Sequence, residues 1–176
     1  MKKLKITEMN RLTVEEFKQE TKTPLVVVLD NVRSLHNVGS VFRTGDAFLV
    51  EAVYLCGITS TPPHAEIHKT ALGAENTVDW KYFEDTHTAV KYLKSEGYTV
   101  FAIEQAEGST MLPDLKLDKT RKYAVILGNE VKGVQQSVVD LCNGCIEIPQ
   151  FGTKHSLNVS VTGGIIIWEM FKKLTP

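Results

Sequence analysis

The feature that most constrains this fold is a series of short, almost continuous apolar runs. They are LVVVLD (25–30), TVFAIE (99–104) and YAVILG (123–128). Runs of this length without polar alternation are typical of strands that are covered on both faces, as in parallel sheets. Because segments with helical patterns separate the runs, we predict an α/β fold with a mostly parallel sheet flanked by helices.

Weaker signals complete this alternating pattern. Thr13 and Glu16 have the spacing of a capping box, which predicts a short helix to about residue 21. Further strands are expected over 52–56, 78–83 and 145–149. Further helices are expected over 37–49, 85–96 and 131–141, and from about residue 157 onward, with a loop at 58–65.

Length and composition indicate one globular domain. The chain has 176 residues, 43% hydrophobic and 23% charged, which argues against disorder. A net charge of −1 gives no bulk attraction to nucleic acid but leaves room for a local basic patch. No signal peptide or membrane span is recognisable, and three cysteines suit a reducing compartment. We therefore expect a cytoplasmic single domain over 1–176, with 1–23 as a short N-terminal extension.

Polar, glycine-containing segments follow several of the predicted strands. In open parallel sheets, ligands bind beyond the carboxyl ends of the strands. That rule directs attention to residues 30–43, 104–108, 128–133 and 149–158.

The first motif lies where a strand leads into a helix. Asn37, Gly39 and Arg43 are spaced so that Gly39 and Arg43 share one helix face. Glycine permits a close approach of the backbone to a partner, and arginine offers a fork of donors suited to phosphate. Taken alone, the pattern is more typical of a helix start with a surface arginine, because a single Asn-x-Gly spacing is a weak motif.

The second motif is ILGNEVKGV (126–134), where a buried strand ends at Gly128. Backbone amides exposed in such a turn can hold a ligand, and Glu130 adds a carboxylate. The alternative is an acidic residue that favours the N-terminus of a helix beginning near Gly133.

The third segment precedes the final helix. Ser156, Asn158, Ser160 and Thr162 lead into an apolar stretch that extends to Met170. A helix apolar nearly all round belongs in a core or an interface, where polar side chains lose their water partners. Capping would explain Ser156 alone. We therefore expect a bound ligand to supply the hydrogen bonds of the others.

The cysteine and histidine spacings raise metal and redox sites as alternatives. Cys142 and Cys145 have C-x-x-C spacing, and His64 and His68 are four residues apart. The proline expected before the first cysteine of a zinc deaminase is replaced by Leu141, and HAEIH is not H-E-x-x-H. We expect no metal, although a zinc or thiol enzyme built on the two cysteines remains the alternative of a different class.

With all three motifs in place, the chain resembles the SpoU (TrmH) family of the SPOUT superfamily, which are RNA ribose 2′-O-methyltransferases. The resemblance covers roughly residues 24–174. It rests on matches to three family motifs, which are Asn37, Gly39 and Arg43; Gly128, Glu130 and Gly133; and Ile148, Pro149, Gly152 and Ser156 to Ser160.

The resemblance implies a deep trefoil knot at the C-terminal end and S-adenosyl-L-methionine as the cofactor. It also implies a homodimer through the C-terminal helix and an RNA substrate, either tRNA or rRNA. The residues that it assigns to cofactor binding are Glu104, Leu127, Gly128, Ile148, Pro149 and Leu157. Those that it assigns to catalysis are Arg43, Asn37, Glu130, Ser156 and Asn158, with Arg43 acting across the dimer interface.

Two departures from the family pattern affect the third segment. Gln150 stands where methionine is common, and Lys154 lies in the loop before Ser156. The resemblance leaves one further alternative, a non-catalytic RNA-binding homologue with the same knotted dimer. The nucleotide that is methylated does not follow from the sequence.

Overall fold

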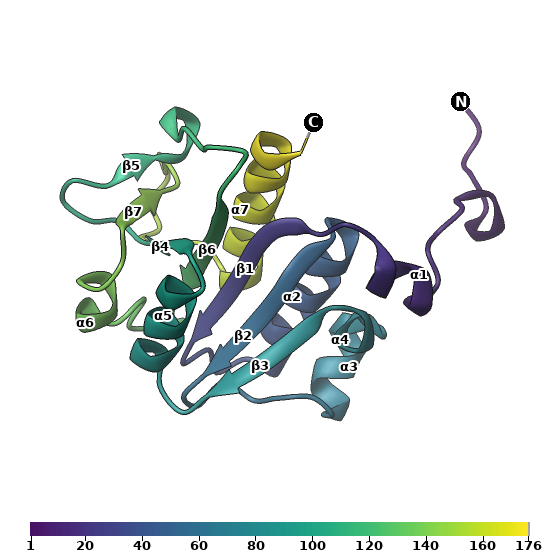
Figure 1. Ribbon diagram of the computed structural model, residues 1–176, viewed down its shortest axis with the longest axis horizontal. Helices are drawn as coiled ribbons and strands as arrows, with labels where there is room; N and C mark the ends of the chain where they lie inside the picture. The colour runs from purple at the N-terminus through teal and green to yellow at the C-terminus, as the bar shows by residue number, and fades with distance from the viewer. Residues whose placement is uncertain (176) are drawn as a thin grey trace.

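The computed structural model describes residues 1–175 and is built on one parallel sheet (Figure 1). Its seven strands have the order β3-β2-β1-β6-β4-β7-β5, and every neighbouring pair is parallel. The strands are β1 (Thr23–Asp30), β2 (Val50–Cys56), β3 (Asp79–Phe83), β4 (Tyr98–Ile103), β5 (Thr110–Met111), β6 (Lys122–Leu127) and β7 (Gly144–Glu147). The predicted α/β class with a parallel sheet is confirmed.

Helices cover both faces of the sheet. The helices are α1 (Val14–Gln19), α2 (Leu35–Ala47), α3 (Ala65–Ala71), α4 (Ala74–Thr77), α5 (Thr86–Ser95), α6 (Gln136–Val139) and α7 (Val159–Leu174), with 3₁₀ turns at Ile6–Glu8 and Leu112–Asp114. In Figure 1, α2 and α7 lie behind the sheet while α5 lies in front of it. Within residues 1–175, no helix is long and apolar enough to cross a bilayer.

Strand β1 shows why the apolar runs predict the sheet. Its residues from Leu25 to Leu29 are fully buried. Leu25, Val27 and Leu29 belong to the core beneath α2 and α7, whereas Val26 and Val28 belong to the core beneath α5. Since successive side chains point to opposite faces, a strand buried on both must be apolar throughout.

The helix predicted over 131–141 is confirmed only over α6 (Gln136–Val139), and its first part is wrong. Residues 129–133 form a tight turn, in which Asn129 and Gly133 exchange backbone hydrogen bonds of 3.0 and 2.9 Å. The side-chain oxygen of Asn129 accepts from the amides of Val131 and Lys132, and Gly133 has a φ of +67°. This left-handed backbone ends any helical path, so α6 begins only at Gln136.

Two other helix starts differ from the prediction because of their capping residues. Helix α2 begins two residues earlier than predicted, since the Ser34 hydroxyl accepts from the amide of Asn37 at 3.2 Å. Helix α7 begins at Val159, two residues later, because Asn158 caps it. The capping box of Thr13 and Glu16 is confirmed at the start of α1.

Gly39 allows α2 and α3 to lie in direct backbone contact. A Cβ atom at Gly39 would lie 2.2 Å from both the Ile67 carbonyl oxygen and the Thr70 hydroxyl. Gly45, in the same helix, has room, because a Cβ there would lie 3.5 Å from the Val50 Cβ. The first glycine is thus required by packing and the second is not.

We expect Gly39→Ala to lower the free energy of unfolding by about 2 kcal/mol, since the Ile67 backbone cannot move aside cheaply. The matched control Gly45→Ala should be neutral or raise it by up to about 1 kcal/mol through helix propensity. Urea unfolding of the two variants measures the difference. Equal effects would contradict this account of the α2–α3 contact.

Candidate functional site

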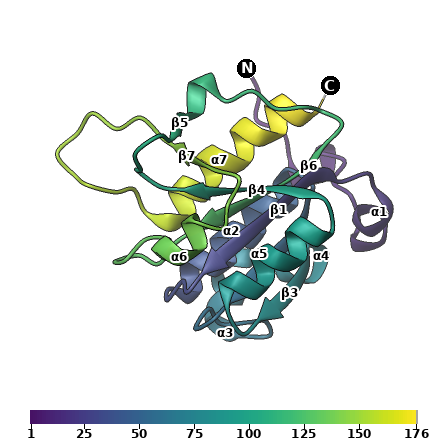
Figure 2. The same ribbon diagram turned by 60° about the vertical axis from the view of Figure 1, so that its left-hand side comes forward.

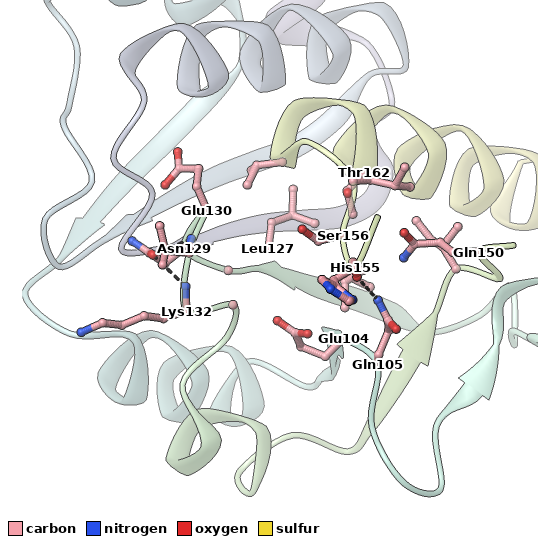
Figure 3. A pocket seen from close by; sticks show the side chains of 17 residues that line it. Glu104, Gln105, Leu127, Asn129, Glu130, Lys132, Gln150, His155, Ser156 and Thr162 are labelled. Atoms are coloured by element: carbon pink, nitrogen blue, oxygen red, sulfur yellow. Dashed lines mark hydrogen bonds between the residues drawn. The ribbon is translucent and has the colours of Figure 1, made fainter. Parts of the chain in front are cut away.

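A cavity of about 300 Å³ lies at the carboxyl ends of β4, β6 and β7 (Figure 3). Its walls come from three separate segments, after β4, after β6 and before α7. The residues assigned to the site from the sequence that line it are Glu104, Leu127, Gly128, Glu130, Ile148, Ser156 and Leu157. Pro149 adjoins this wall in the chain but does not line the cavity. The position of the cavity follows the rule for open parallel sheets.

The floor of the cavity depends on two glycines. A Cβ at Gly128 would lie 2.1 Å from the carbonyl carbon of Gly133 and 2.2 Å from the amide nitrogen of Val134. A Cβ at Gly133 would lie 2.2 Å from the Glu104 carboxylate, whose Oε1 accepts from the amide of Val134 at 2.7 Å. The turn after β6 can therefore lie directly against the end of β4 only because both positions lack side chains.

Glu130 joins the first motif to the second. Its carboxylate accepts from the backbone amides of Arg33 and Ser34, at 3.0 and 2.9 Å, and from Asn37 Nδ2 at 3.3 Å. Since Ser34 is the N-cap of α2, Glu130 lies at the N-terminus of that helix. The alternative, that Glu130 serves a helix beginning near Gly133, is wrong, because the turn at 129–133 intervenes and α6 begins at Gln136.

The third segment joins the same network through Asn158. Its Nδ2 donates to Asn37 Oδ1 at 3.3 Å, while its Oδ1 accepts from the amides of Ser160 and Val161. Asn37 is buried and contacts both partners. The three sequence motifs, more than 90 residues apart at their extremes, therefore meet in one chain of hydrogen bonds that runs from Asn158 through Asn37 to Glu130.

The expected burial of polar groups in the third segment is wrong within one chain. Ser156, Leu157 and Asn158 are exposed, and Phe151 is 97% exposed. Figure 2 shows the reason, because the segment between β7 and α7 forms a long loop that projects from the domain. Only Thr162, half-buried in the first turn of α7, lines the cavity as a polar side chain of that helix.

Arg43 is not brought to this network. It is exposed on α2, does not line the cavity, and forms no hydrogen bond or ion pair with any residue in the described part of the chain. Within a single chain the site therefore contains Asn37, Glu130, Ser156 and Asn158 without the guanidinium.

Among the cavity residues that were not assigned to the site from the sequence are Gln105 and His155. Gln105 follows β4 directly, and its Nε2 donates to the His155 carbonyl oxygen at 2.5 Å (Figure 3). This bond ties the projecting loop to the sheet. Both residues fall within segments that the ligand rule singled out, Gln105 in 104–108 and His155 in 149–158, but no motif distinguishes them there.

The cysteines and histidines have structural surroundings. Burial raises the pKa of Cys142 to about 11, and burial also raises the pKa of Cys145, which disfavours both thiolates. His64 caps α3, and His68 pairs with the buried carboxylate of Glu75 at 2.6 Å. Over residues 1–175, no group of three or more ligating side chains is arranged to hold a metal ion.

Comparison with known proteins identifies the family to which the chain belongs. Residues 24–168 match the sequence model of the SpoU rRNA Methylase family, so the chain belongs to that family. It is 33% identical to a tRNA (guanosine(18)-2′-O)-methyltransferase of Thermus thermophilus, over 93% of this chain and 82% of that one. It is 32% identical to a 23S rRNA (guanosine-2′-O-)-methyltransferase of Nitrosomonas europaea, over 96% of this chain and 64% of that one.

Solved structures show the same fold. A TrmH/SpoU tRNA modifying enzyme of A. aeolicus superposes with a TM-score of 0.79 and 25% identity, covering 91% of this chain and 81% of that one. An AdoMet-bound rRNA methyltransferase from Sinorhizobium meliloti has a TM-score of 0.79 and 26% identity, covering 93% of this chain and 60% of that one.

The charge of Glu130 is stabilised where it lies. Burial raises its pKa, but hydrogen bonds from the Arg33 and Ser34 amides and from Asn37 outweigh burial, so the pKa falls below its ordinary value. A carboxyl group with a depressed folded-state pKa contributes stability above its unfolded pKa. That contribution is lost as the pH falls through the folded pKa.

We expect Glu130→Gln to lower the free energy of unfolding at pH 7 by about 2 kcal/mol, because an amide group cannot accept all three bonds. The deficit should shrink as the pH falls below the ordinary glutamate pKa of about 4.3 and through the lower folded value. Urea unfolding at several pH values measures it, with the exposed Glu107→Gln as the control. A deficit independent of pH would refute the role of the charge.

Proposed function

We propose that this protein is an S-adenosyl-L-methionine-dependent methyltransferase that methylates a ribose 2′-hydroxyl in tRNA or rRNA. The observation that carries the proposal is the network of Asn158, Asn37 and Glu130 beside the cavity. Membership of the SpoU family supports it, as do relatives that are named 2′-O-methyltransferases. Methyl incorporation from labelled cofactor into bulk RNA tests it.

The cavity fits the proposed cofactor. Its volume of about 300 Å³ lies within the range of small-molecule sites. Leu127, Ile148 and Leu157 offer apolar contacts for a flat base, and the backbone of Gly128, which lines the cavity, can offer hydrogen bonds to its edge. We assign Glu104, Leu127, Gly128, Ile148, Pro149 and Leu157 to cofactor binding. When bound, S-adenosylmethionine supplies a methyl group activated by its positive sulfonium.

The side chains of this protein position the ribose. Ser156 lies on the cavity wall and can contact a hydroxyl group, while Asn37 and Asn158 hold Glu130 in place. Such alignment can supply much of the acceleration of an in-line displacement. Arg43 is assigned to the substrate phosphate and to the charge that develops on the 2′-oxygen. A guanidinium remains protonated in proteins, so we do not assign it the role of base.

A homodimer through α7 would complete the site. Val161, Ile165 and Trp168 are 51%, 37% and 46% exposed, and their spacing places them on one face of α7. A continuous apolar stripe of this kind marks an interaction surface. Because Arg43 forms no hydrogen bond or ion pair with the Glu130 network of its own chain and does not line that cavity, we assign it to the site of the partner. The C-terminal trefoil knot, the single-domain organisation and the cytoplasmic location belong to the same proposal.

Replacing Arg43 by alanine should lower the rate of methyl transfer by about 10³-fold, since charge stabilisation of the reacting oxygen is lost. Cofactor affinity, measured by calorimetry, should be unchanged because Arg43 does not line the cavity. Undiminished turnover would remove Arg43 from the mechanism. A wild-type protein that binds RNA without methylating it would instead favour the non-catalytic alternative.

Mixed dimers test whether Arg43 acts across the interface. Ser156→Trp should block the cavity from an exposed position without disturbing the core, so that each variant alone is inactive. Co-assembly of Arg43→Ala and Ser156→Trp chains should restore activity, because one site then combines an open cavity with the partner's arginine. If Arg43 acts within its own chain, the mixture stays inactive.

Ile165→Asp should convert the dimer to a monomer, because it places a charge in the proposed interface without removing a fully buried side chain. Light scattering after size-exclusion chromatography measures the mass, and circular dichroism verifies the fold. Leu4→Asp, at a position 63% exposed outside the stripe, is the control. A wild-type monomer, or a variant that remains dimeric, would overturn the interface.

A further inference from the structure

A second cavity, of about 390 Å³, lies beside the first. It is bounded by the segment after β1, by Ile58 and by the turn at 129–133. The residues common to both cavities are Asn129, Val131, Lys132 and Gly133, so the turn forms a wall between them. In Figure 3, the Lys132 side chain extends away from Ser156 and Gln150.

The floor of this second cavity is built from satisfied polar groups. Asp30 is fully buried and accepts from the Thr86 hydroxyl at 2.6 Å and from the amide and Nε2 of Gln135 at 3.1 and 3.0 Å. Asn31 donates to Asp30, and its own Oδ1 accepts from the amide of Ile58 at 3.1 Å. The buried carboxylate is therefore committed to holding the walls together, which gives the cavity a fixed shape.

The rim carries two cationic side chains that form no ion pair in the described part of the chain, and two exposed aliphatic side chains. Arg33 and Lys132 are exposed, and neither side chain pairs with a carboxylate anywhere in the described chain. Ile58 and Val131 are also on the rim, with 65% and 78% of their surface exposed. Two unpaired cations beside two bare aliphatic side chains suit a ligand that combines negative charge with a flat apolar face.

We propose that this cavity binds a nucleotide of the RNA that flanks the methylated one, an inference that rests on the proposed function. Arg33 and Lys132 contact its phosphate, and Ile58 and Val131 pack against its base. Charge complementarity to RNA supports this occupant, as does the shared wall, which places the cavity next to the site proposed for the reacting ribose.

The cavity is also linked to the reacting site through the backbone. The amide of Arg33 donates to Glu130, and Asn129 Nδ2 donates to the Asn31 carbonyl oxygen at 2.8 Å. A nucleotide seated against Arg33 would thus be positioned by the same segment that fixes Glu130. The cavity therefore sets which sequence context reaches the methyl-transfer site, and Ile58 and Arg33 act as specificity residues.

Arg33→Ala and Ile58→Ser test this proposal without altering the cofactor cavity, because neither residue lines it. At saturating cofactor, Arg33→Ala should raise KM for unfractionated tRNA or rRNA about tenfold, with kcat and cofactor affinity unchanged. Ile58→Ser should raise KM less, and Arg33→Lys should partly restore it. Lys91→Ala, an exposed unpaired cation on α5, and Leu4→Ser, at 63% exposure, are matched controls.

A direct binding measurement separates this proposal from the proposed function. Ribonucleoside 5′-monophosphates, titrated into ¹⁵N-labelled protein with cofactor present, should shift the amides of Asn31, Ile58 and Val131. Inorganic phosphate alone should shift them less, and the shifts should weaken in Arg33→Ala.

Each outcome has a distinct meaning. If the wild type methylates RNA but both variants keep the wild-type KM, the cavity is not a nucleotide site and the proposed function stands. If the wild type methylates no RNA, the proposed function fails and the titration decides alone. Shifts that are absent there overturn the nucleotide site, and shifts that require Arg33 support it.

Discussion

The interaction on which the site depends is the acceptance of three hydrogen bonds by the Glu130 carboxylate. Two come from the backbone amides of Arg33 and Ser34, which are otherwise free donors at the start of α2. The carboxylate therefore satisfies two backbone donors at the helix terminus and complements the helix dipole. It also joins residues 96 and 97 positions apart in the chain, which no local interaction could bring together. Together with the bond from Asn129 Nδ2 to the Asn31 carbonyl oxygen, this anchor fixes the turn after β6 against the start of α2.

The turn at 129–133, which contains Glu130, separates the two cavities. Both polar atoms of the Asn129 side chain form hydrogen bonds. The oxygen accepts from the backbone amides of Val131 and Lys132, and the nitrogen donates to the Asn31 carbonyl oxygen. Gly133 then reverses the chain so closely to Glu104 that a Cβ has no space. This one turn therefore forms a wall with a cavity on each of its sides.

The sequence was most informative where burial alone decides structure. The run LVVVLD is apolar because β1 is covered on both faces. Helices α2 and α5 could likewise be predicted, because the residues that they bury against the sheet are mostly apolar. The prediction of a helix failed at residues 131–135, because the left-handed backbone of Gly133 and the side chain of Asn129 form a turn there. The exposure of Ser156 to Asn158 could not be predicted either, since it depends on how a loop is directed in space.

The contacts at the N-cap of α7 require an amide side chain, which Asn158 supplies, rather than a hydroxyl or a carboxylate. Its oxygen accepts from two backbone amides, as any good N-cap would, and its nitrogen donates to Asn37 Oδ1. Serine would cap the helix but could not reach both partners, and aspartate would set a second negative charge against the oxygen of Asn37. Because Asn37 passes its own donor on to Glu130, the direction of every hydrogen bond in the chain is fixed. The requirement for asparagine at position 158 therefore comes from the Glu130 network as much as from capping of the apolar helix α7.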